Sequence, residues 1–184
     1  MATLDLVPIY MNDRPDLLDR LGEALGRILH MSIRQRTPAF DPEAAYDRSR
    51  GQYNSTVMLR LLLGDPGITG DRLLGVTSVD LCTPVLTYVF GEAQLDGRGS
   101  VVSVHRLRTE VYGLPPDDAL LYERLQKEAV HELGHTFGLV HCADPGCVMH
   151  ASTYAEEIDF KGPGLCPRCL GVVRAAINQS RAAT

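Results

Sequence analysis

The sequence predicts a mixed α/β fold, and three observations lead to this class. Segments with the alternation of strands are interspersed with segments whose apolar residues recur at helical spacing. A long helix is predicted before the last quarter of the chain. The residues after it carry four of the five cysteines and show little periodicity. With 184 residues, we expect one domain over 1–184, with an N-terminal subdomain (1–138) and a C-terminal subdomain (139–184).

The first part of the chain is expected to alternate strands and helices. LDLVPIYM is apolar and partly alternating, whereas the leucines after it recur every three or four residues. Asp13 can cap the first helix, and Asn54 or Ser55 can cap the second, which Gly64 ends. The expected order is a strand over 4–11, a helix up to residue 29, a short strand near 31–36, an irregular stretch over 37–54 and a helix over 55–63.

The rest of the chain is expected to give three strands and two helices. LLGVTSVDL, LTYVF and VVSVHRL are rich in β-branched and aromatic residues, which favours strands. Pro115-Pro116 then interrupts the chain, and Asp117-Asp118 is suited to the positive end of a helix. The expected elements are strands over 73–81, 86–90 and 101–107, a helix over 117–137 and a closing helix over 170–182.

Charge and hydropathy limit the partners that we expect. The net charge of −5 argues against a nucleic-acid or an anionic-membrane partner. No apolar run approaches the roughly eighteen residues of a membrane-spanning helix. The N-terminus lacks a basic segment followed by an apolar run, so we expect no signal peptide and a cytoplasmic protein. No feature of the sequence indicates an oligomeric state.

The predicted long helix carries His131-Glu132-Leu133-Gly134-His135, an HExxH motif. Residues four apart lie on one helix face, so His131 and His135 can bind the same ion. Glu132 is rotated by about 100° from His131 and can reach a metal-bound water without being a ligand. This arrangement is typical of zinc hydrolases.

The residues after the motif complete a set of three nitrogen ligands. Gly138 can adopt a left-handed conformation that ends the helix and turns the chain. His141 can then return as the third ligand and leave a fourth position open, as a catalytic zinc site requires. On the opposite face of the helix we expect an apolar stripe, whereas Arg124 and Glu128 should partly fill the free face. The stripe consists of Leu121, Leu125, Ala129, Leu133 and Phe137.

The cysteines predict a second metal site. Neighbouring side chains of an extended chain point to opposite sides, so Cys142 should face away from the metal that His141 binds. Together with Cys147, Cys166 and Cys169, it has the spacing of a structural zinc site with four cysteines. Two disulfides or an iron–sulfur cluster are the alternatives. The isolated Cys82 should be a small buried residue.

The stretch HELGHTFGLVHCADPGCVM, continued by CPRC, resembles the archaemetzincins, a branch of the metzincin metallopeptidases. Every motif position of that family is matched by type, including Met149. The segment between Met149 and Cys166 is one residue shorter than is usual in the family, which we attribute to a loop deletion. The run VTSVDLCTPVLTYVFGEAQLDGRGSVVSVHRL is similar to the family's central strands.

The resemblance implies a metzincin-like zinc-peptidase domain with a mixed, twisted sheet and a C-terminal subdomain held by zinc. Met149 should lie in a tight turn as an apolar floor beneath the histidines. An edge strand near Phe90–Ala93 should line the cleft, where a peptide substrate would add as an extended strand. Thr153 and Tyr154 should form a side wall, and we expect Tyr154 to be packed rather than to stabilise an oxyanion.

The predicted function is a zinc-dependent metallopeptidase in which Glu132 is the general base for a zinc-activated water. The sequence does not distinguish an endopeptidase from an aminopeptidase. Two Zn²⁺ ions are expected per chain, one catalytic and one structural. The alternatives are a catalytically weak two-zinc module that binds peptides or has a regulatory role, and hydrolysis of an amide other than a peptide.

Overall fold

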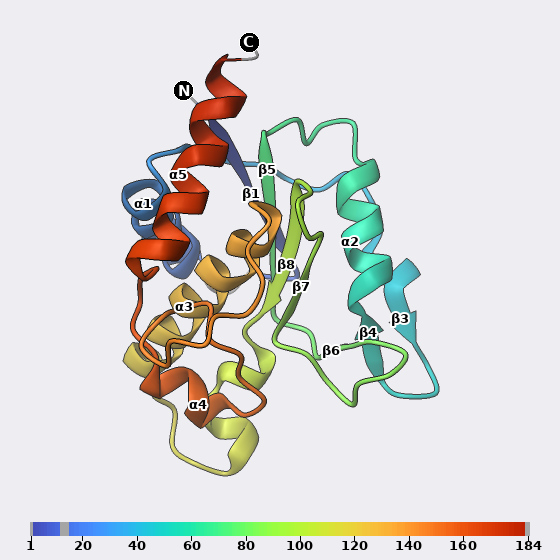
Figure 1. Cartoon of the computed structure of the whole chain (residues 1–184). Helices are drawn as coiled ribbons and strands as arrows, with labels where there is room; N and C mark the ends of the chain where they lie inside the picture. The colour runs from blue at the N-terminus through green and yellow to red at the C-terminus, as the bar shows by residue number, and fades with distance from the viewer. Residues whose placement is uncertain (1, 12–14, 183–184) are drawn as a thin grey trace.

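A five-stranded sheet forms the centre of the computed structural model, which describes residues 2–11 and 15–182 (Figure 1). The strand order is β2-β1-β5-β8-β7, in which all neighbours are parallel except β7 and β8. The predicted mixed sheet is therefore confirmed. Its strands are β1 (Thr3–Ile9), β2 (Ser32–Gln35), β5 (Arg72–Thr77), β7 (Gly91–Ala93) and β8 (Gly99–Ser103). Asp13, which we expected to cap the first helix, lies outside the described residues.

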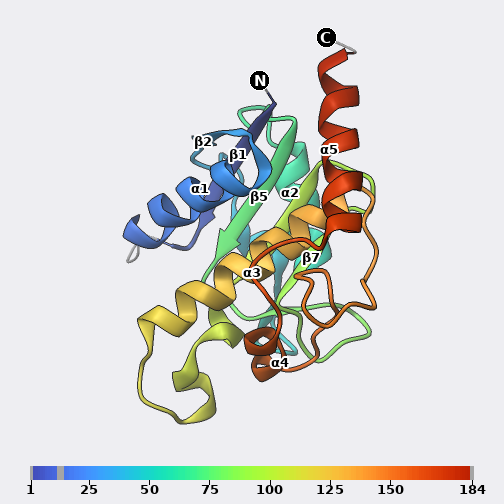
Figure 2. The ribbon, with the colours of Figure 1, turned by 60° about the vertical axis from the view of Figure 1, so that its left-hand side comes forward.

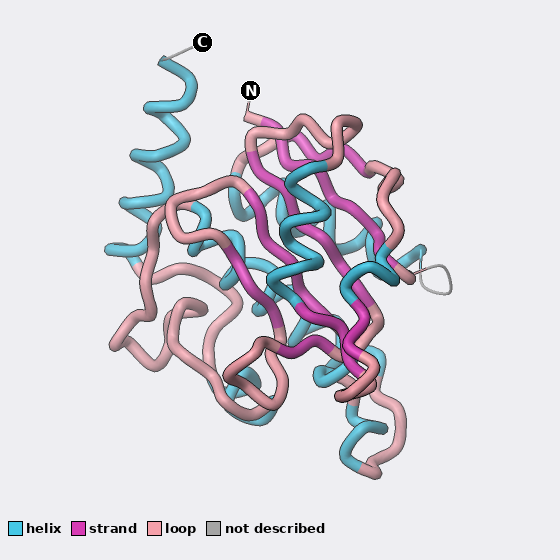
Figure 3. The backbone as a smooth tube through the Cα atoms, turned by 90° about the vertical axis from the view of Figure 1, so that its right-hand side faces the viewer, coloured by secondary structure: helices cyan, strands magenta, loops and turns pink. Residues whose placement is uncertain are grey.

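Helices cover both faces of the sheet. α1 (Pro15–Leu29) and α3 (Asp118–Thr136) pack on one face, and α2 (Ser55–Gly64) packs on the other, in front of the strands in Figure 3. α5 (Pro167–Ala182) lines a pocket together with the end of α1, and its last turn projects beyond the sheet (Figure 2). Successive strand residues serve opposite faces: Leu73 joins the core under α2, whereas Leu74 joins the core under α1 and α3.

Short elements connect these layers. A second, smaller sheet and three 3₁₀ helices occupy stretches that we expected to be irregular or extended. They are β3 (Tyr46–Asp47), β4 (Gln52–Asn54), β6 (Leu81–Cys82), η1 (Pro42–Ala45), η2 (His105–Leu107) and η3 (Thr109–Tyr112). Asn54 caps α2, as predicted, by accepting a hydrogen bond from the Val57 N–H. In the part of the chain that the structure describes, no helix is long and apolar enough to span a membrane.

The predicted strand over 86–90 is wrong. These residues form a loop with one bridge, between Leu81 and Val89, and the edge strand begins at Gly91. The Arg50 guanidinium accounts for the difference, since it donates to the carbonyls of Leu86 and Thr87 at 2.7 and 2.9 Å. The Arg50 side chain thus occupies carbonyl oxygens that would otherwise accept hydrogen bonds from a neighbouring strand.

Two strand boundaries and one helix also differ from expectation. The predicted strand over 101–107 ends at Ser103, whose hydroxyl accepts from the His105 N–H at 3.0 Å and begins the turn into η2. The predicted strand over 73–81 ends at Thr77. The tail contains an unexpected helix, α4 (Ala155–Phe160), in which Glu157 accepts from the Tyr154 N–H.

α3 is buried on nearly all sides. The predicted apolar stripe is buried. Arg124 and Glu128, which we expected on the free face, are also buried, at 5 % and 3 % exposure, and of the two only Glu128 lines the cleft. Arg124 donates to both oxygens of Asp159 at 2.7 Å, because α4 and the residues after it cover this face. A helix buried in this way needs a partner for each charge that it carries.

Asp80 connects β4 to η2 through its hydrogen bonds. Its carboxylate accepts from Arg106 at 2.8 and 2.6 Å and from Gln52 at 2.9 Å. Burial alone would raise the pKa of Asp80, but the hydrogen bonds from Arg106 and Gln52 outweigh it and lower this pKa below its ordinary value.

We predict that Asp80→Asn lowers the free energy of unfolding at pH 7 by about 1–3 kcal/mol. Asp80 stabilises the fold above a pH of about 4, its unfolded-state pKa, and loses this contribution as pH falls through its lower folded-state pKa. Urea unfolding between pH 2 and 7 should therefore show a flatter acid dependence for the variant. Asp16→Asn, at an exposed carboxylate, is the control. An unchanged acid dependence in Asp80→Asn would contradict the assignment.

Candidate metal centre and cleft

His131 and His135 are held one helical turn apart on α3, and each ring is oriented by a backbone carbonyl. The Nδ1 of His131 lies 2.9 Å from the Val148 carbonyl, and the Nδ1 of His135 lies 2.7 Å from the Leu139 carbonyl. A carbonyl can only accept, so both Nδ1 atoms carry the proton. Each Nε2 therefore presents a lone pair, as a metal-binding imidazole requires.

The two Nε2 atoms face each other at 3.2 Å. Two lone pairs at this distance repel unless a cation lies between them. Tetrahedral coordination with zinc–nitrogen bonds of about 2.05 Å places two ligand nitrogens roughly 3.3 Å apart. The spacing of the pair therefore fits zinc.

His141 joins this pair from the chain that follows α3. Its ring centroid lies 5.3 Å from that of His131 and 5.2 Å from that of His135. One nitrogen of each of the three rings falls within a group whose members lie within 4.8 Å of one another. Gly138 makes the return possible because it has the expected left-handed conformation, with φ of +83°. The structure thus brings the three predicted histidines together.

Burial keeps the helical histidines neutral. It lowers the pKa of His131 to about 3, with Lys161 adding to the shift, and also lowers the pKa of His135. Neutral imidazole is the form that binds a metal, so these two rings need not lose a proton first at neutral pH.

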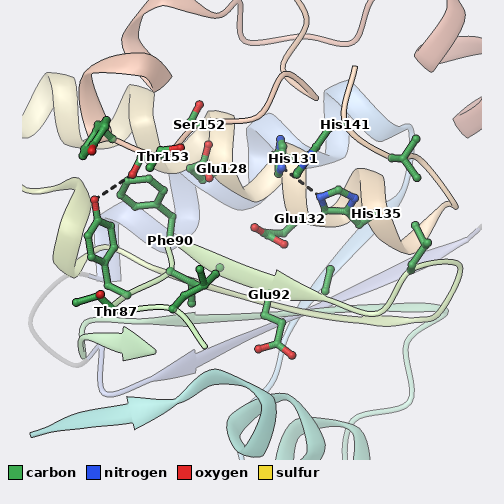
Figure 4. A pocket seen from close by; sticks show the side chains of 18 residues that line it. Thr87, Phe90, Glu92, Glu128, His131, Glu132, His135, His141, Ser152 and Thr153 are labelled. Atoms are coloured by element: carbon green, nitrogen blue, oxygen red, sulfur yellow. Dashed lines mark hydrogen bonds between the residues drawn. The ribbon is translucent and has the colours of Figure 1, made fainter. Parts of the chain in front are cut away.

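Glu132 lies next to the histidines in the same cleft (Figure 4). Burial raises the pKa of its carboxyl well above the ordinary value, and the nearby Glu128 adds to this effect, whereas Lys161 opposes it. A carboxyl with a raised pKa is a better proton acceptor than an exposed one. Its position also depends on Gly91 of β7, where an added Cβ would lie 2.6 Å from Glu132 Cγ.

Met149 lies in a turn that packs against α3. The His150 N–H donates to the Cys147 carbonyl at 2.9 Å, which closes the turn. Met149 is fully buried against α3 at Gly134, where a Cβ would overlap its Sδ. The close packing of Met149 thus requires a glycine within the HExxH motif.

A cleft of about 730 Å³ opens above these residues. β7 lines one side, and the residues after the Met149 turn line another, which confirms the expected edge strand and side wall. Tyr154 is 61 % exposed, so the expectation that it is packed is wrong. The cleft is lined by Leu86, Thr87, Tyr88, Val89, Phe90, Gly91, Glu92, Ala93, Leu95, Glu128, His131, Glu132, His135, Val140, His141, Ser152, Thr153 and Tyr154.

The four tail cysteines form a second cluster. The Sγ atoms of Cys142, Cys147, Cys166 and Cys169 all lie within 4.8 Å of one another. The Sγ atoms of Cys142 and Cys166 are 3.9 Å apart, which is far longer than a disulfide but close to the roughly 3.8 Å between thiolates on one zinc. All five cysteines are free thiols, so the disulfide alternative is not supported.

Electrostatics favour a cation in this cluster. The Asp144 N–H is the main cause of the lowered pKa of Cys142, and Arg168 adds to it. Burial raises the pKa of Cys147 and Cys169. A bound divalent cation would offset that burial cost by stabilising the thiolates. Cys82 is buried elsewhere, as expected.

Comparison with known proteins places this arrangement in a family. The model of peptidase family M54 matches residues 42–175. The chain is 46 % identical over 163 residues to the archaemetzincin of Methanopyrus kandleri, covering 89 % of each protein.

The chain belongs to the archaemetzincin family, peptidase family M54.

Solved structures agree with this membership. The crystal structure of the archaemetzincin from Methanopyrus kandleri matches with a TM-score of 0.84 at 40 % identity, over 96 % of each chain. A zinc-dependent peptidase from Methanocorpusculum labreanum matches with a TM-score of 0.79 at 29 % identity, over 92 % of this chain and 99 % of that one. The predicted family and enzyme class, a zinc metallopeptidase, are thus confirmed.

Several residues around this archaemetzincin site were not singled out from the sequence. The carbonyls of Val148 and Leu139 carry no side-chain signal, so their contacts with the histidines could only come from the fold. Lys161 offered a weak signal, since it is one of only two lysines among the 18 basic residues of the chain. Both lysines are buried, whereas a solvated charge would more often be exposed.

We predict that Gly91→Ala lowers peptidase activity by at least about tenfold while zinc content is retained. The added Cβ would contact Glu132 and also the Val101 carbonyl at 2.6 Å, so either the glutamate or the edge strand must move. Activity and metal content should be measured on the same preparation. Gly171→Ala, where the added Cβ meets open space, should retain full activity. Full activity in Gly91→Ala would show that this contact does not position Glu132.

Proposed function

We propose that the chain hydrolyses peptide bonds at the cleft between β7 and α3, with His131, His135 and His141 as the ligands of a catalytic zinc. The observation that carries this proposal is the pair of unprotonated Nε2 atoms, 3.2 Å apart, beside the buried Glu132. When bound, zinc supplies Lewis acidity: it lowers the pKa of water from about 16 towards about 7 and polarises a carbonyl oxygen.

Glu132 is the residue that moves protons in this proposal. Its raised pKa suits it to take a proton from the attacking water and then to give that proton to the leaving amine. The two carbonyls that hold the histidine rings keep the nitrogens aimed at one point throughout the reaction. Gly91 allows Glu132 to lie close enough to the edge strand to reach a peptide there.

The substrate is proposed to bind as an added strand along β7. β7 pairs with β8 on one side, and no strand of the described residues pairs with its other edge, which faces the cleft. Backbone hydrogen bonds to that edge would fix an extended peptide irrespective of its sequence. The side chains on either side of the scissile bond would then meet the two ends of the cleft.

A second, structural zinc is proposed at Cys142, Cys147, Cys166 and Cys169. It would connect the start of α5 to the residues that leave the catalytic site, because Cys142 directly follows His141. The Cys142 N–H also donates to the Met149 carbonyl at 2.8 Å, which ties the cluster to the floor of the catalytic site. This zinc would hold together the proposed C-terminal subdomain, 139–184, against the N-terminal subdomain, 1–138.

We predict that Glu132→Gln lowers kcat by about 10²–10⁴-fold while the chain keeps its zinc. The amide keeps the shape of the side chain but cannot accept a proton from water. The measurement is cleavage of a quenched peptide library at matched zinc content. Glu123→Gln, an exposed substitution on the same helix, is the matched control.

The same experiment separates hydrolysis from the peptide-binding alternative. A zinc-loaded native chain that binds peptides without cleaving them would favour the binding module. Normal zinc-dependent turnover by Glu132→Gln would show that the assigned mechanism is wrong.

We also predict that Cys166→Ser/Cys169→Ser lowers the zinc content from two ions per chain to about one. Two of the four thiolates are lost, and a hydroxyl is a poor ligand for zinc. Elemental analysis of the native and variant chains gives the ratio directly, and circular dichroism reports whether the tail stays folded. Cys82→Ser, outside the cluster, should leave the ratio unchanged. Retention of two zinc ions by the double variant would contradict the assignment.

A further inference from the structure

One end of the cleft carries a carboxylate that hydrolysis does not require. Glu128 lies one turn before Glu132 on α3 and lines the cleft, although it is only 3 % exposed. The cleft lining contains three glutamates and no lysine or arginine. Burying a carboxylate costs free energy unless a charged or hydrogen-bonding partner offsets the lost hydration.

Lys161 is the partner of Glu128, but it approaches from outside the cleft. Its Nζ lies 2.9 Å from Glu128 Oε1 and donates to the His150 carbonyl at 3.0 Å. The Lys161 side chain is 1 % exposed and does not line the cleft. The group that a substrate would meet at this position is therefore the carboxylate and not the ammonium.

The acceptor capacity of this carboxylate is not used up. Glu128 Oε1 is buried and lies 2.9 Å from Lys161 Nζ, whereas no hydrogen bond reaches Glu128 Oε2 among the described residues. Ser152 Oγ, which belongs to the side wall of the same cleft, is also buried without a hydrogen-bond partner among the described residues. Figure 4 places Glu128 and Ser152 on the same side of His131, the side of Thr87 and Thr153. Glu128 Oε2 and the Ser152 hydroxyl thus have no hydrogen-bond partner at this end of the cleft among the described residues.

The direction of β7 shows which part of a peptide reaches this end. The Tyr88 hydroxyl, just before β7, donates to the Thr153 carbonyl at 3.0 Å, whereas the Asp96 N–H, after β7, donates to the His135 carbonyl at 3.0 Å. β7 therefore runs from the Glu128 end towards the His135 end. A substrate paired antiparallel to β7, the more stable pairing, would place its leaving-amine side at the Glu128 end.

We propose that Glu128 and Ser152 form a subsite that selects a lysine or arginine side chain directly after the scissile bond. This inference rests on the proposed function. The substrate cation would complete the hydrogen bonding of Glu128, and the Tyr88 and Phe90 rings, which line the same end, would cover its apolar stem. Lys161 is a positioning residue that holds Glu128 from behind.

The test compares peptides that differ only in the residue after the scissile bond. Arginine and glutamine have similar lengths, so the ratio of their kcat/KM values isolates the charge. We expect the native chain to prefer arginine by about ten- to a hundredfold, which corresponds to one charge-assisted hydrogen bond. Glu128→Gln should reduce the ratio to about one, and Ser152→Ala should reduce it by about threefold. Glu123→Gln should leave both the ratio and the activity unchanged.

A second variant keeps the test decisive if Glu128→Gln fails to fold, because that change leaves Lys161 buried and unpaired. Glu128→Leu/Lys161→Met replaces the pair by apolar groups of similar size, which proteins often tolerate. It should prefer leucine over arginine after the scissile bond. A native chain without preference, or a preference that survives in the folded variants, would overturn the proposal.

A measurement of peptide binding tests the subsite independently of the proposed hydrolysis. Zinc-loaded Glu132→Gln should bind the arginine peptide about tenfold more tightly than the glutamine peptide. If the native chain cleaves no peptide but binding still discriminates, the hydrolytic mechanism is wrong and the subsite stands. If peptides are cleaved without discrimination in cleavage or binding, the subsite is wrong and the mechanism stands.

Discussion

Two imidazole nitrogens that face each other at 3.2 Å are the constraint on which the structure depends. The Val148 and Leu139 carbonyls hold the opposite nitrogens protonated, so that both lone pairs face the same point. Both carbonyls belong to the chain after α3, so the helix alone could not build the site. The left-handed turn at Gly138 and the buried Met149 turn bring that chain back beneath the helix. Much of the C-terminal fold therefore serves the orientation of two rings.

The motif residues could be predicted because their spacing has a direct geometric meaning. A four-residue interval on a helix aligns His131 with His135, and the glycine three residues later allows the return of His141. The alternation of side chains along an extended chain likewise predicts that Cys142 and His141 serve different sites. In each case the decisive interaction joins residues that are close in the sequence. One sequence was therefore enough to predict it.

The predictions that failed depend on contacts between distant residues. The loop over 86–90 has the composition of a strand, but Arg50 binds its carbonyls from elsewhere in the chain. The burial of Arg124 and Glu128 was not predicted either, because their partners Asp159 and Lys161 come from the tail. The spacing of these arginines and of Lys161 in the sequence does not predict which residues they bind. Long-range contacts of Arg50 and Lys161 hold residues that line the cleft, so the cleft itself was less predictable than the proposed metal ligands within it.

The shortness of β7 has a consequence for solubility. The outer edge of β7 pairs with no strand of the described residues, and an unpaired edge can recruit the edge of another molecule. β7 is only three residues long and includes Gly91 and the charged Glu92. Few backbone groups are thus available to a second copy of the chain, and a charge opposes stacking of like edges. The short, charged edge thus disfavours fibrous self-association through β7.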